Sequence, residues 1–246
     1  DNSEVPIITT KKVAWKTAIA EMLWIWQMKS NRVQDLRDLN MTFNGGRNTS
    51  VWDEWENSSG NIGQAYGYQM GRIVNEVELD TPIGRFKENV DQVDNLIYGL
   101  KNKPYSRRHV TEIWIPSDLD IMMLPPCVHL TQWHVKGNKL HLEVRARSSD
   151  VGLGNCFNVF QYNVLQRMIA QITGYKLGEF IFYMGDAHIY DRHIEPLEEQ
   201  VQRKQFDAPT LWINPEIDNF YDFTLDDFRL DDYQHGDEIQ LEVAVS

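Results

Sequence analysis

The sequence predicts a mixed fold class, in which α-helices and β-strands pack together in one globular chain. Three features carry this prediction: an apolar helical run over 10–28, an amphipathic helix over 157–172, and a β-hairpin centred on Gly137-Asn138. Of the 246 residues, 42% are hydrophobic and 11% aromatic, which argues against disorder. A chain of this length can bury a core as one large domain or two small ones, and no linker, repeat or low-complexity tract divides it.

The segment from Thr10 to Met28 is predicted to be a buried helix. Its apolar residues recur every three to four positions, and the run AIAEMLWIW offers almost no polar face. Glu21 is the one charged residue in that run. A buried carboxylate must be paired, hydrogen-bonded or protonated, whereas a glutamate beside a solvent gap has no special role. The residues alone leave both interpretations open for Glu21.

The next segments are two loops and one helix. Residues 40–50 are predicted to form a loop because they are rich in glycine and asparagine, and residues 71–89 are polar and turn-rich, which is typical of an exposed insertion. Val90 to Leu100 has a single apolar stripe and is predicted to be a helix. Lys101-Asn102-Lys103-Pro104 ends that helix.

The strand that follows Gly137-Asn138 has one apolar face and one charged face. Its apolar residues are Leu140, Leu142, Val144 and Ala146, which alternate with His141, Glu143, Arg145 and Arg147. We therefore expect a sheet with one face toward the core and the other available for polar contacts.

Cys127, which lies just before this hairpin, is a candidate thiol nucleophile. A cysteine attacks as its thiolate, so positive charge that lowers the thiol pKa favours reaction, and Arg145 and Arg147 lie one short hairpin away. Pro125-Pro126 fix the approach to Cys127. The commoner role of a free cysteine is that of a small buried hydrophobe, and we assign this role to Cys156.

The clearest amphipathic helix runs from Phe157 to Ile172, with Gly174 as its stop. Gly152 and Gly154 precede it in a pattern like a dinucleotide fingerprint. Because Phe157 stands where the third glycine belongs, we reject a Rossmann site. The N-terminus of this helix can still favour a nearby anion.

The C-terminal part contains a possible metal site and a possible strand. Four residues with metal-ligating side chains lie close in sequence: Asp186, His188, Asp191 and His193. Their spacing is no standard zinc pattern and no cysteine lies nearby, so no metal is expected. Residues 239–245 alternate apolar and polar, which predicts a half-buried strand.

The charge balance limits the partners. A formal charge of −12 and a pI near 5.0 argue against broad nucleic-acid binding, which needs a basic surface. Arginines clustered within that acidic background favour a local phosphate pocket instead. No apolar run approaches the roughly 20 residues of a membrane span, and no signal peptide opens the chain. Two unlike cysteines form no disulfide framework, so a reducing, cytoplasmic location is expected.

Five short motifs stand in one register along the chain. They are Leu124-Pro125-Pro126-Cys127, Arg147-Ser148-Ser149-Asp150, Leu153-Gly154, Phe157-Asn158 and Gly185-Asp186-Ala187-His188-Ile189-Tyr190. In order and spacing they resemble the thymidylate synthase family, most closely its folate-dependent bacterial and phage branch. The likeness extends from Thr9-Thr10-Lys11-Lys12 to the last strand. It implies an α+β fold with residues 1–246 as one catalytic domain, a large mixed β-sheet with flanking helices, and a homodimer interface on the back of that sheet.

The resemblance also implies a methyltransferase that makes dTMP from dUMP, with 5,10-methylenetetrahydrofolate as the carbon and hydride donor and no metal. Cys127 would add to C6 of the uracil, Glu21 and ordered water would relay protons, and Tyr66 would assist loss of the C5 proton. The side-chain amide of Asn158 presents a donor and an acceptor, which suits uracil, whereas a carboxylate there marks cytosine-using relatives. Arg147 and Asp150 complete the implied catalytic set.

The binding residues are likewise implied by the resemblance. Phosphate would be held by Arg147, Ser148 and, across a two-fold interface, Arg107 and Arg108 of the partner subunit. His188 and Tyr190 would hydrogen-bond the sugar hydroxyl, and Asp150 and Asn158 complete the substrate set. The residues implied for folate are Trp52, Trp55, Leu124, Asp150, Leu153, Gly154, Phe157 and Ala244. Without the resemblance, the two tryptophans could simply be core residues.

Two other functions stay open at this point. A dUMP hydroxymethylase would share the covalent steps and finish with water in place of hydride, although Trp52, which shields the intermediate in the family, favours methylation. A catalytically impaired relative that binds only nucleotide, folate or its own message would have no need of Cys127. The chain opens with Asp1-Asn2-Ser3, and the resemblance implies that an upstream loop, with an arginine for the phosphate, is missing.

Overall fold

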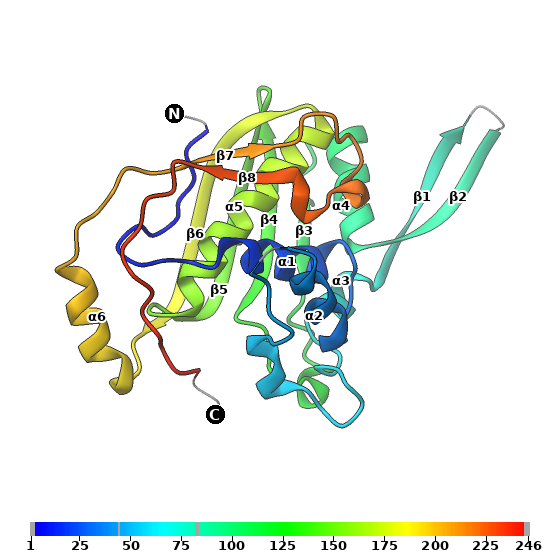
Figure 1. The fold of residues 1–246 in the computed structure, drawn as a ribbon. Helices are drawn as coiled ribbons and strands as arrows, with labels where there is room; N and C mark the ends of the chain where they lie inside the picture. Colours follow the sequence, from blue (N-terminus) through cyan, green and yellow to red (C-terminus); the bar gives the residue numbers. More distant parts are fainter. Residues whose placement is uncertain (1–2, 44, 82–83, 244–246) are drawn as a thin grey trace.

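The centre of the molecule is a four-stranded β-sheet. In this computed structural model, which describes residues 3–43, 45–81 and 84–243, the strands lie in the order β3 (Val110–Glu112), β4 (Val128–Lys136), β5 (Lys139–Asp150) and β6 (Lys176–His188). Neighbours among the first three strands are antiparallel, and β6 runs parallel to β5. The sheet is therefore mixed, as the resemblance implied (Figure 1).

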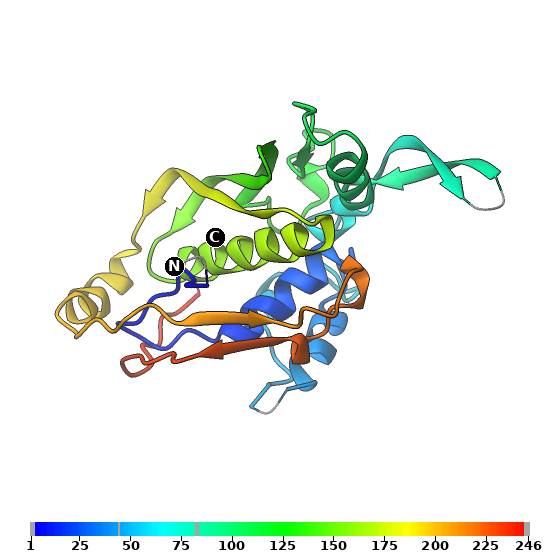
Figure 2. The same ribbon diagram turned by 90° about the horizontal axis from the view of Figure 1, so that it is seen from above.

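One long helix covers the inner face of this sheet. Helix α5 (Gly154–Thr173) is the crossover that allows β5 and β6 to be parallel. Beyond α5 lie α1 (Trp15–Trp26) and the two-stranded sheet of β7 (Thr210–Ile213) and β8 (Phe228–Asp231) (Figure 2). The core lies between these layers, where the inward side chains of β5, such as Leu142, are fully buried.

The remaining elements surround this core. They are α2 (Val33–Met41), α3 (Gly67–Met70), α4 (Gln92–Asn102), α6 (Ile194–Val201), the hairpin strands β1 (Ile73–Thr81) and β2 (Gly84–Asp91), and the 3-10 turns η1 (Val51–Trp55), η2 (Leu119–Ile121), η3 (Asp191–His193), η4 (Phe220–Asp222) and η5 (Leu225–Asp227).

Several local predictions are confirmed. The hairpin turns at Gly137, which has a φ of 64°, and α5 ends at Gly174, which has a φ of 74°; both angles favour glycine. The helix predicted over 90–100 is α4, which begins later because the side chain of Asp91 accepts from the backbone N–H groups of Val93 and Asp94. Such an N-cap sets the first residue of a helix.

Three predictions need correction. The helix expected over 10–28 is shorter, because α1 begins at Trp15 and the N–H of Val13 donates to the hydroxyl of Tyr233 at 3.0 Å and not within a helix. Within 71–89, residues 73–81 and 84–89 lie in the strands of the β1–β2 hairpin and not in a loop, while the expected exposure is confirmed, since the hairpin projects from the body (Figures 1 and 2). The strand predicted over 239–245 is wrong for residues 239–243, which form no strand with any described residue. Ala244 and Val245 lie outside the described residues.

Candidate active site

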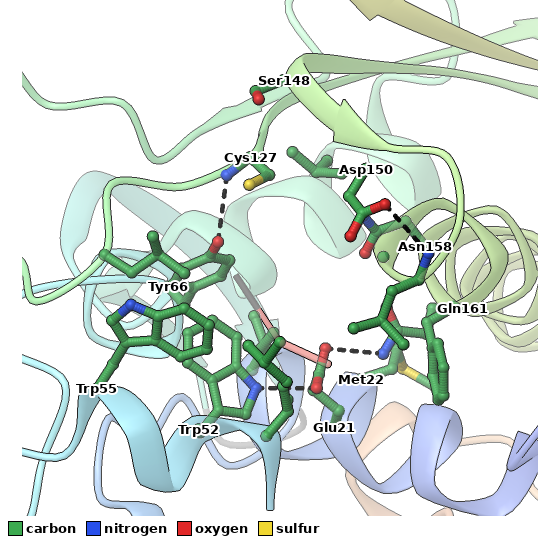
Figure 3. A pocket seen from close by; sticks show the side chains of 18 of the residues that line it. Glu21, Met22, Trp52, Trp55, Tyr66, Cys127, Ser148, Asp150, Asn158 and Gln161 are labelled. Atoms are coloured by element: carbon green, nitrogen blue, oxygen red, sulfur yellow. Dashed lines mark hydrogen bonds between the residues drawn. The ribbon is translucent and has the colours of Figure 1, made fainter. Parts of the chain in front are cut away.

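A cavity of about 480 Å³ opens between α1, η1, the ends of β4 and β5, the start of α5 and the C-terminal segment. This volume suits small-molecule ligands. The predicted site residues that line it are Glu21, Trp52, Trp55, Tyr66, Leu124, Cys127, Arg147, Ser148, Asp150, Leu153, Gly154, Phe157, Asn158, His188 and Tyr190. Figure 3 shows Cys127 and Asp150 on one side of the cavity, with Trp52 and Glu21 on the opposite side.

Two predicted residues lie elsewhere. Arg107 and Arg108 are exposed on the segment between α4 and β3 and do not line this cavity. Ala244 lies outside the described residues. A single chain therefore brings together most of the predicted set, but not the two arginines assigned to a neighbouring subunit.

Cys127 is half-buried at the start of β4, where the backbone fixes it from two sides. Its N–H donates to the hydroxyl of Tyr66 at 3.1 Å, and its carbonyl accepts from the N–H of Arg147 at 2.8 Å. Burial raises the pKa of the Cys127 thiol, although the charge of Arg147 and a hydrogen bond from Tyr66 lower it in part, while Asp150 raises it. The balance keeps the thiol protonated without a ligand.

This balance corrects the expectation that two arginines would depress the pKa of Cys127. Arg147 acts in that direction but is outweighed by burial. Arg145 points away, because it pairs with Glu143 at 3.4 Å and lies 4.7 Å from the ring centre of Tyr183. Arg145 and Arg147 point to the same face of β5, because they are two residues apart. Only Arg147 reaches the cavity.

Arg147 is held ready for an anion. Its Nε donates to the carbonyl of Pro126 at 3.0 Å and its Nη2 to that of Pro125 at 2.9 Å. The guanidinium also lies 5.3 Å from the ring centre of Trp114. Because an arginine has five N–H donors, the remaining ones can bind phosphate oxygens from a fixed position.

Tyr66 has a strained backbone. Its φ of 47° lies in the left-handed region, which costs a bulky residue about 1–3 kcal/mol. The chain passes close to another loop here, since a Cβ on Gly67 would lie 2.1 Å from the carbonyl oxygen of Ser30. Burial raises the pKa of Tyr66 well above its ordinary value, with a contribution from Cys127. The hydroxyl is thus neutral, accepts from the N–H of Cys127 and lies beside its thiol.

Glu21 lies at the bottom of the cavity and is hydrogen-bonded. The indole Nε1 of Trp52 donates to its Oε2 at 2.8 Å, and Nε2 of Gln161 donates to its Oε1 at 3.0 Å (Figure 3). Burial raises the pKa of Glu21, and these two hydrogen bonds lower it in part. Of the two interpretations left open by the sequence, the buried and hydrogen-bonded carboxylate is confirmed.

Asp150 and Asn158 lie where β5 leads into α5. Oδ1 of Asp150 accepts from the N–H groups of Gly152 and Leu153 at 3.0 and 3.3 Å, which fixes the carboxylate at the cavity wall. The side-chain amide of Asn158 makes no hydrogen bond to another described residue, so both its donor and its acceptor are available. An amide in this state can read the edge of a planar base.

His188 and Tyr190 form the rim near the end of β6. Their ring centres are 5.0 Å apart in an edge-on arrangement. Nδ1 of His188 lies 3.3 Å from the carbonyl of Asp186, and a carbonyl can only accept, so this nitrogen is the donor. In the neutral ring Nε2 is then an acceptor, which can take a hydrogen bond from a hydroxyl group.

The sequence interpretation missed several residues of the cavity wall. They are Thr17, Met22, Ile25, Trp26, Ser50, Val51, Val128, Gln161, Tyr162, Leu241 and Val243. Gln161 is the one with a direct role, since its Nε2 also donates to the carbonyl of Ala18 at 3.0 Å and is thereby oriented toward Glu21. Its signal was a polar residue three positions after Asn158, on the inward side of an amphipathic helix.

Within the described ranges, no group of three or more histidine, cysteine, aspartate or glutamate side chains could hold a metal ion. No helix among those residues is long and apolar enough to cross a membrane. Both cysteines are free thiols. The cavity instead offers flat aromatic and apolar side chains beside a few polar groups, which suits planar organic ligands.

The chain matches the family model described as thymidylate synthase over residues 1–245. Thymidylate synthase 1 of Bacillus subtilis (strain 168) is 60% identical over 245 residues, which cover 100% of this chain and 82% of that protein. The thymidylate synthase of Bacillus phage phi3T is 59% identical over 245 residues, with the same coverage of 100% and 82%. The solved structure of thermostable thymidylate synthase A from Bacillus subtilis superimposes with a TM-score of 0.87 at 60% identity, covering 100% of this chain and 83% of that one. The chain belongs to the thymidylate synthase family and has its fold.

Proposed function

We propose that this chain is a methyltransferase that converts dUMP to dTMP, with 5,10-methylenetetrahydrofolate as the donor of both the carbon and the hydride. Family membership over the full chain carries this assignment. The observation that supports it in the molecule is the convergence of Cys127, Tyr66, Glu21 and Asn158 on one cavity. A thiol, a neutral phenol, a desolvated carboxylate and a free amide are the groups this reaction needs.

Cys127 is the proposed nucleophile. Its sulfur forms a bond to C6 of the uracil, and the electron pair of the C5–C6 double bond moves toward the C4 oxygen, so that C5 can attack the one-carbon unit of the folate. Because the pKa of the thiol is raised without a ligand, we expect thiolate formation to follow nucleotide binding. Arg147, fixed 2.8 Å from the carbonyl of Cys127 through its own N–H, supplies the nearest positive charge.

The proton steps fall to two buried groups. Tyr66 assists removal of the C5 proton, since its hydroxyl is held beside the nucleophile by the N–H of Cys127, from which it accepts at 3.1 Å. Glu21 relays protons through water, for which a pKa raised by burial is suited. Loss of the C5 proton is accompanied by cleavage of the bond between the transferred carbon and the folate nitrogen, which leaves a methylene group on C5. Hydride transfer from the resulting tetrahydrofolate to this methylene gives the methyl group and dihydrofolate, and the sulfur of Cys127 is expelled from C6 as the C5–C6 double bond forms again.

Asn158 is proposed to select the base. Its amide can donate to the C4 oxygen of uracil and accept from the adjacent ring N–H at the same time. Ser148 and Arg147 bind the phosphate, and His188 and Tyr190 bind the sugar hydroxyl, all from the cavity wall. This set favours dUMP over dCMP, because an exocyclic amine at C4 cannot accept the amide hydrogen.

The folate is assigned to the aromatic and apolar end of the cavity. The lining residues proposed for it are Trp52, Trp55, Leu124, Leu153, Gly154 and Phe157, together with Ala244, which lies outside the described residues. Flat indole rings suit a pterin and an aminobenzoyl group. The carboxylate of Asp150, oriented by two backbone N–H groups, can accept hydrogen bonds from the pterin.

We further propose a homodimer that pairs the outer faces of the central sheets and shares its arginines. That face exposes apolar side chains on β6, including Ile181 at 37% and Tyr183 at 42%. Arg107 and Arg108 are exposed outside the cavity. A two-fold contact would let each subunit provide these arginines to the phosphate of the other.

Residues 1–246 are proposed to act as one catalytic domain, and a cytoplasmic location remains a prediction based on two free thiols. The test of the reaction is incubation with dUMP and methylenetetrahydrofolate, followed by dihydrofolate formation and product mass. Equal amounts of dTMP and dihydrofolate support the synthase. Hydroxymethyl-dUMP without dihydrofolate would identify a hydroxymethylase, and tight binding of dUMP without any product would identify a binding-only relative.

A further inference from the structure

His193 links two parts of the cavity wall that are far apart in sequence. It closes η3, directly before α6, and its side chain is only 1% exposed. Its Nε2 lies 2.8 Å from the backbone carbonyl of Glu242. Because a carbonyl oxygen can only accept, Nε2 carries the hydrogen and donates. The ring also packs edge-on against Tyr190, with ring centres 5.6 Å apart.

The second ring nitrogen faces the site. Nδ1 of His193 is buried without a hydrogen-bond partner among the described residues, and the nearest carboxylate oxygen is Oδ1 of Asp150 at 3.7 Å. Buried polar atoms are usually paired, and this separation is slightly longer than a hydrogen bond. One imidazole thus stands between the carboxylate at the cavity wall and the C-terminal segment.

The C-terminal segment packs against the same turn. Leu241 lines the cavity, as does Asp150. A Cβ on Gly152, in the turn after Asp150, would lie 3.3 Å from Cδ1 of Leu241 and 3.4 Å from Nδ1 of His193. Because even a single added carbon would be tightly spaced here, the turn, the imidazole and the C-terminal segment pack closely together, so that a shift of one part displaces the others.

We propose that His193 is a positioning residue for folate binding: it holds residues 239–243 against the turn after Asp150, so that the Asp150 carboxylate and the wall formed by Leu241 are placed together. This inference rests on the proposed contact between Asp150 and the pterin. Arg192 provides a second link, with Nη1 3.6 Å from Oε2 of Glu242, but its side chain and that of Glu242 are 45% and 83% exposed. An exposed ion pair contributes little, which makes Arg192 a matched control.

Two substitutions at His193 distinguish the hydrogen bond made by Nε2 from the space that the ring fills. In His193→Gln the amide nitrogen can still donate to the carbonyl of Glu242, whereas the shorter side chain in His193→Asn cannot reach it. We expect His193→Asn to raise the KM for methylenetetrahydrofolate about tenfold, the effect of one lost hydrogen bond, with the KM for dUMP unchanged. His193→Gln and Arg192→Ala should stay close to the unsubstituted enzyme in both constants.

Hydrogen exchange of residues 239–243 in the ligand-free protein tests the anchor separately from the folate contact. Exchange should accelerate in His193→Asn and not in His193→Gln or Arg192→Ala. Faster exchange with an unchanged folate KM would overturn the link to folate while leaving the proposed reaction intact. Equal effects of His193→Asn and His193→Gln, or parallel changes in both KM values, would mean that the ring only fills space and would also overturn the proposal.

A deletion of residues 239–246 provides a second check on the coupling between His193 and this segment. If His193 acts through this segment, adding His193→Gln or His193→Asn to the deletion leaves the folate KM of the deleted protein unchanged. Independent, multiplied effects of the deletion and the substitutions would contradict the coupling.

Discussion

The indole nitrogen of Trp52 donates a hydrogen bond to the carboxylate of Glu21 at 2.8 Å, across the bottom of the cavity. Gln161, on α5, donates to the other oxygen at 3.0 Å. The carboxylate therefore has a fixed orientation and two donors that favour its charged form, while burial favours its neutral form. The net effect raises the pKa of Glu21, which suits a group that takes up and releases a proton during the reaction.

Glu21→Gln should lose most activity while keeping nucleotide affinity. A glutamine has one acceptor oxygen, so either Trp52 or Gln161 loses its partner, and the amide cannot relay a proton. We expect kcat to fall by roughly 10²- to 10³-fold, with the KM for dUMP within about threefold. Steady-state kinetics measure both constants, and a kcat within a few-fold of the unsubstituted enzyme would remove Glu21 from the proton relay.

Trp52→Phe should move the pH profile in a predictable direction. The hydrogen bond from Trp52 lowers the pKa of Glu21, so its removal raises that pKa further. If Glu21 must be ionised to accept a proton, activity is lost below its pKa, and the acidic limb of kcat against pH shifts to higher pH. At a pH above the pKa of Glu21 in both the unsubstituted protein and Trp52→Phe, the activity of the variant should be closer to that of the unsubstituted protein.

Trp55→Phe is the control for this pH profile, since Trp55 lines the same cavity and packs on Trp52 with ring centres 5.8 Å apart. No hydrogen bond joins it to Glu21 in the described structure. The acidic limb of kcat against pH for Trp55→Phe should not shift. A shift of equal size in both variants would attribute the effect to aromatic packing.

Asn158→Asp should change the preferred base. A carboxylate can accept from the exocyclic amine of cytosine but cannot donate to the C4 oxygen of uracil. We expect turnover of dUMP to fall by roughly 10²-fold or more and methylation of dCMP to appear, with the products identified by mass. If the variant keeps the dUMP preference, Asn158 does not read the base.

Two inactive variants should restore each other if the arginines act across a dimer. One carries Cys127→Ala, and the other carries Arg107→Ala with Arg108→Ala. A mixed dimer then contains one complete site, formed by the intact Cys127 of one chain and the intact arginines of the other. With random exchange in an equal mixture, about a quarter of the full site activity should return. No recovery, despite subunit exchange shown by mass, would place the arginines in their own subunit or outside the site.

The sequence predicted the parts of the site that depend on short motifs. Arg147, Asp150 and Asn158 lie within one strand–turn–helix region, and Cys127 directly precedes β4, which pairs with that strand in a hairpin, so their order in the chain fixes their proximity. Their convergence with Glu21 from α1 needed the resemblance, because no local pattern reports which helices pack together.

What the sequence did not predict depends on tertiary packing. The pKa of Cys127 was expected to be lowered by charge, but burial outweighs Arg147, and burial is a property of the folded chain. Alternation over 239–243 predicted a strand, but a strand also needs a hydrogen-bonding neighbour, and these described residues have none. The partnership of Gln161 with Glu21 spans 140 residues, which no helical spacing can show.

The central claim is that Cys127 forms a bond to the nucleotide beside the bound folate. The most direct measurement uses 5-fluoro-dUMP with methylenetetrahydrofolate and peptide mass spectrometry. Fluorine at C5 cannot leave as a cation where a proton would, so the reaction stops with sulfur on C6 and the folate carbon on C5. The account predicts that the peptide containing Cys127 gains the mass of both ligands and that Cys127→Ala gains none. An adduct on Cys156, or full turnover of dUMP by Cys127→Ala, would contradict it.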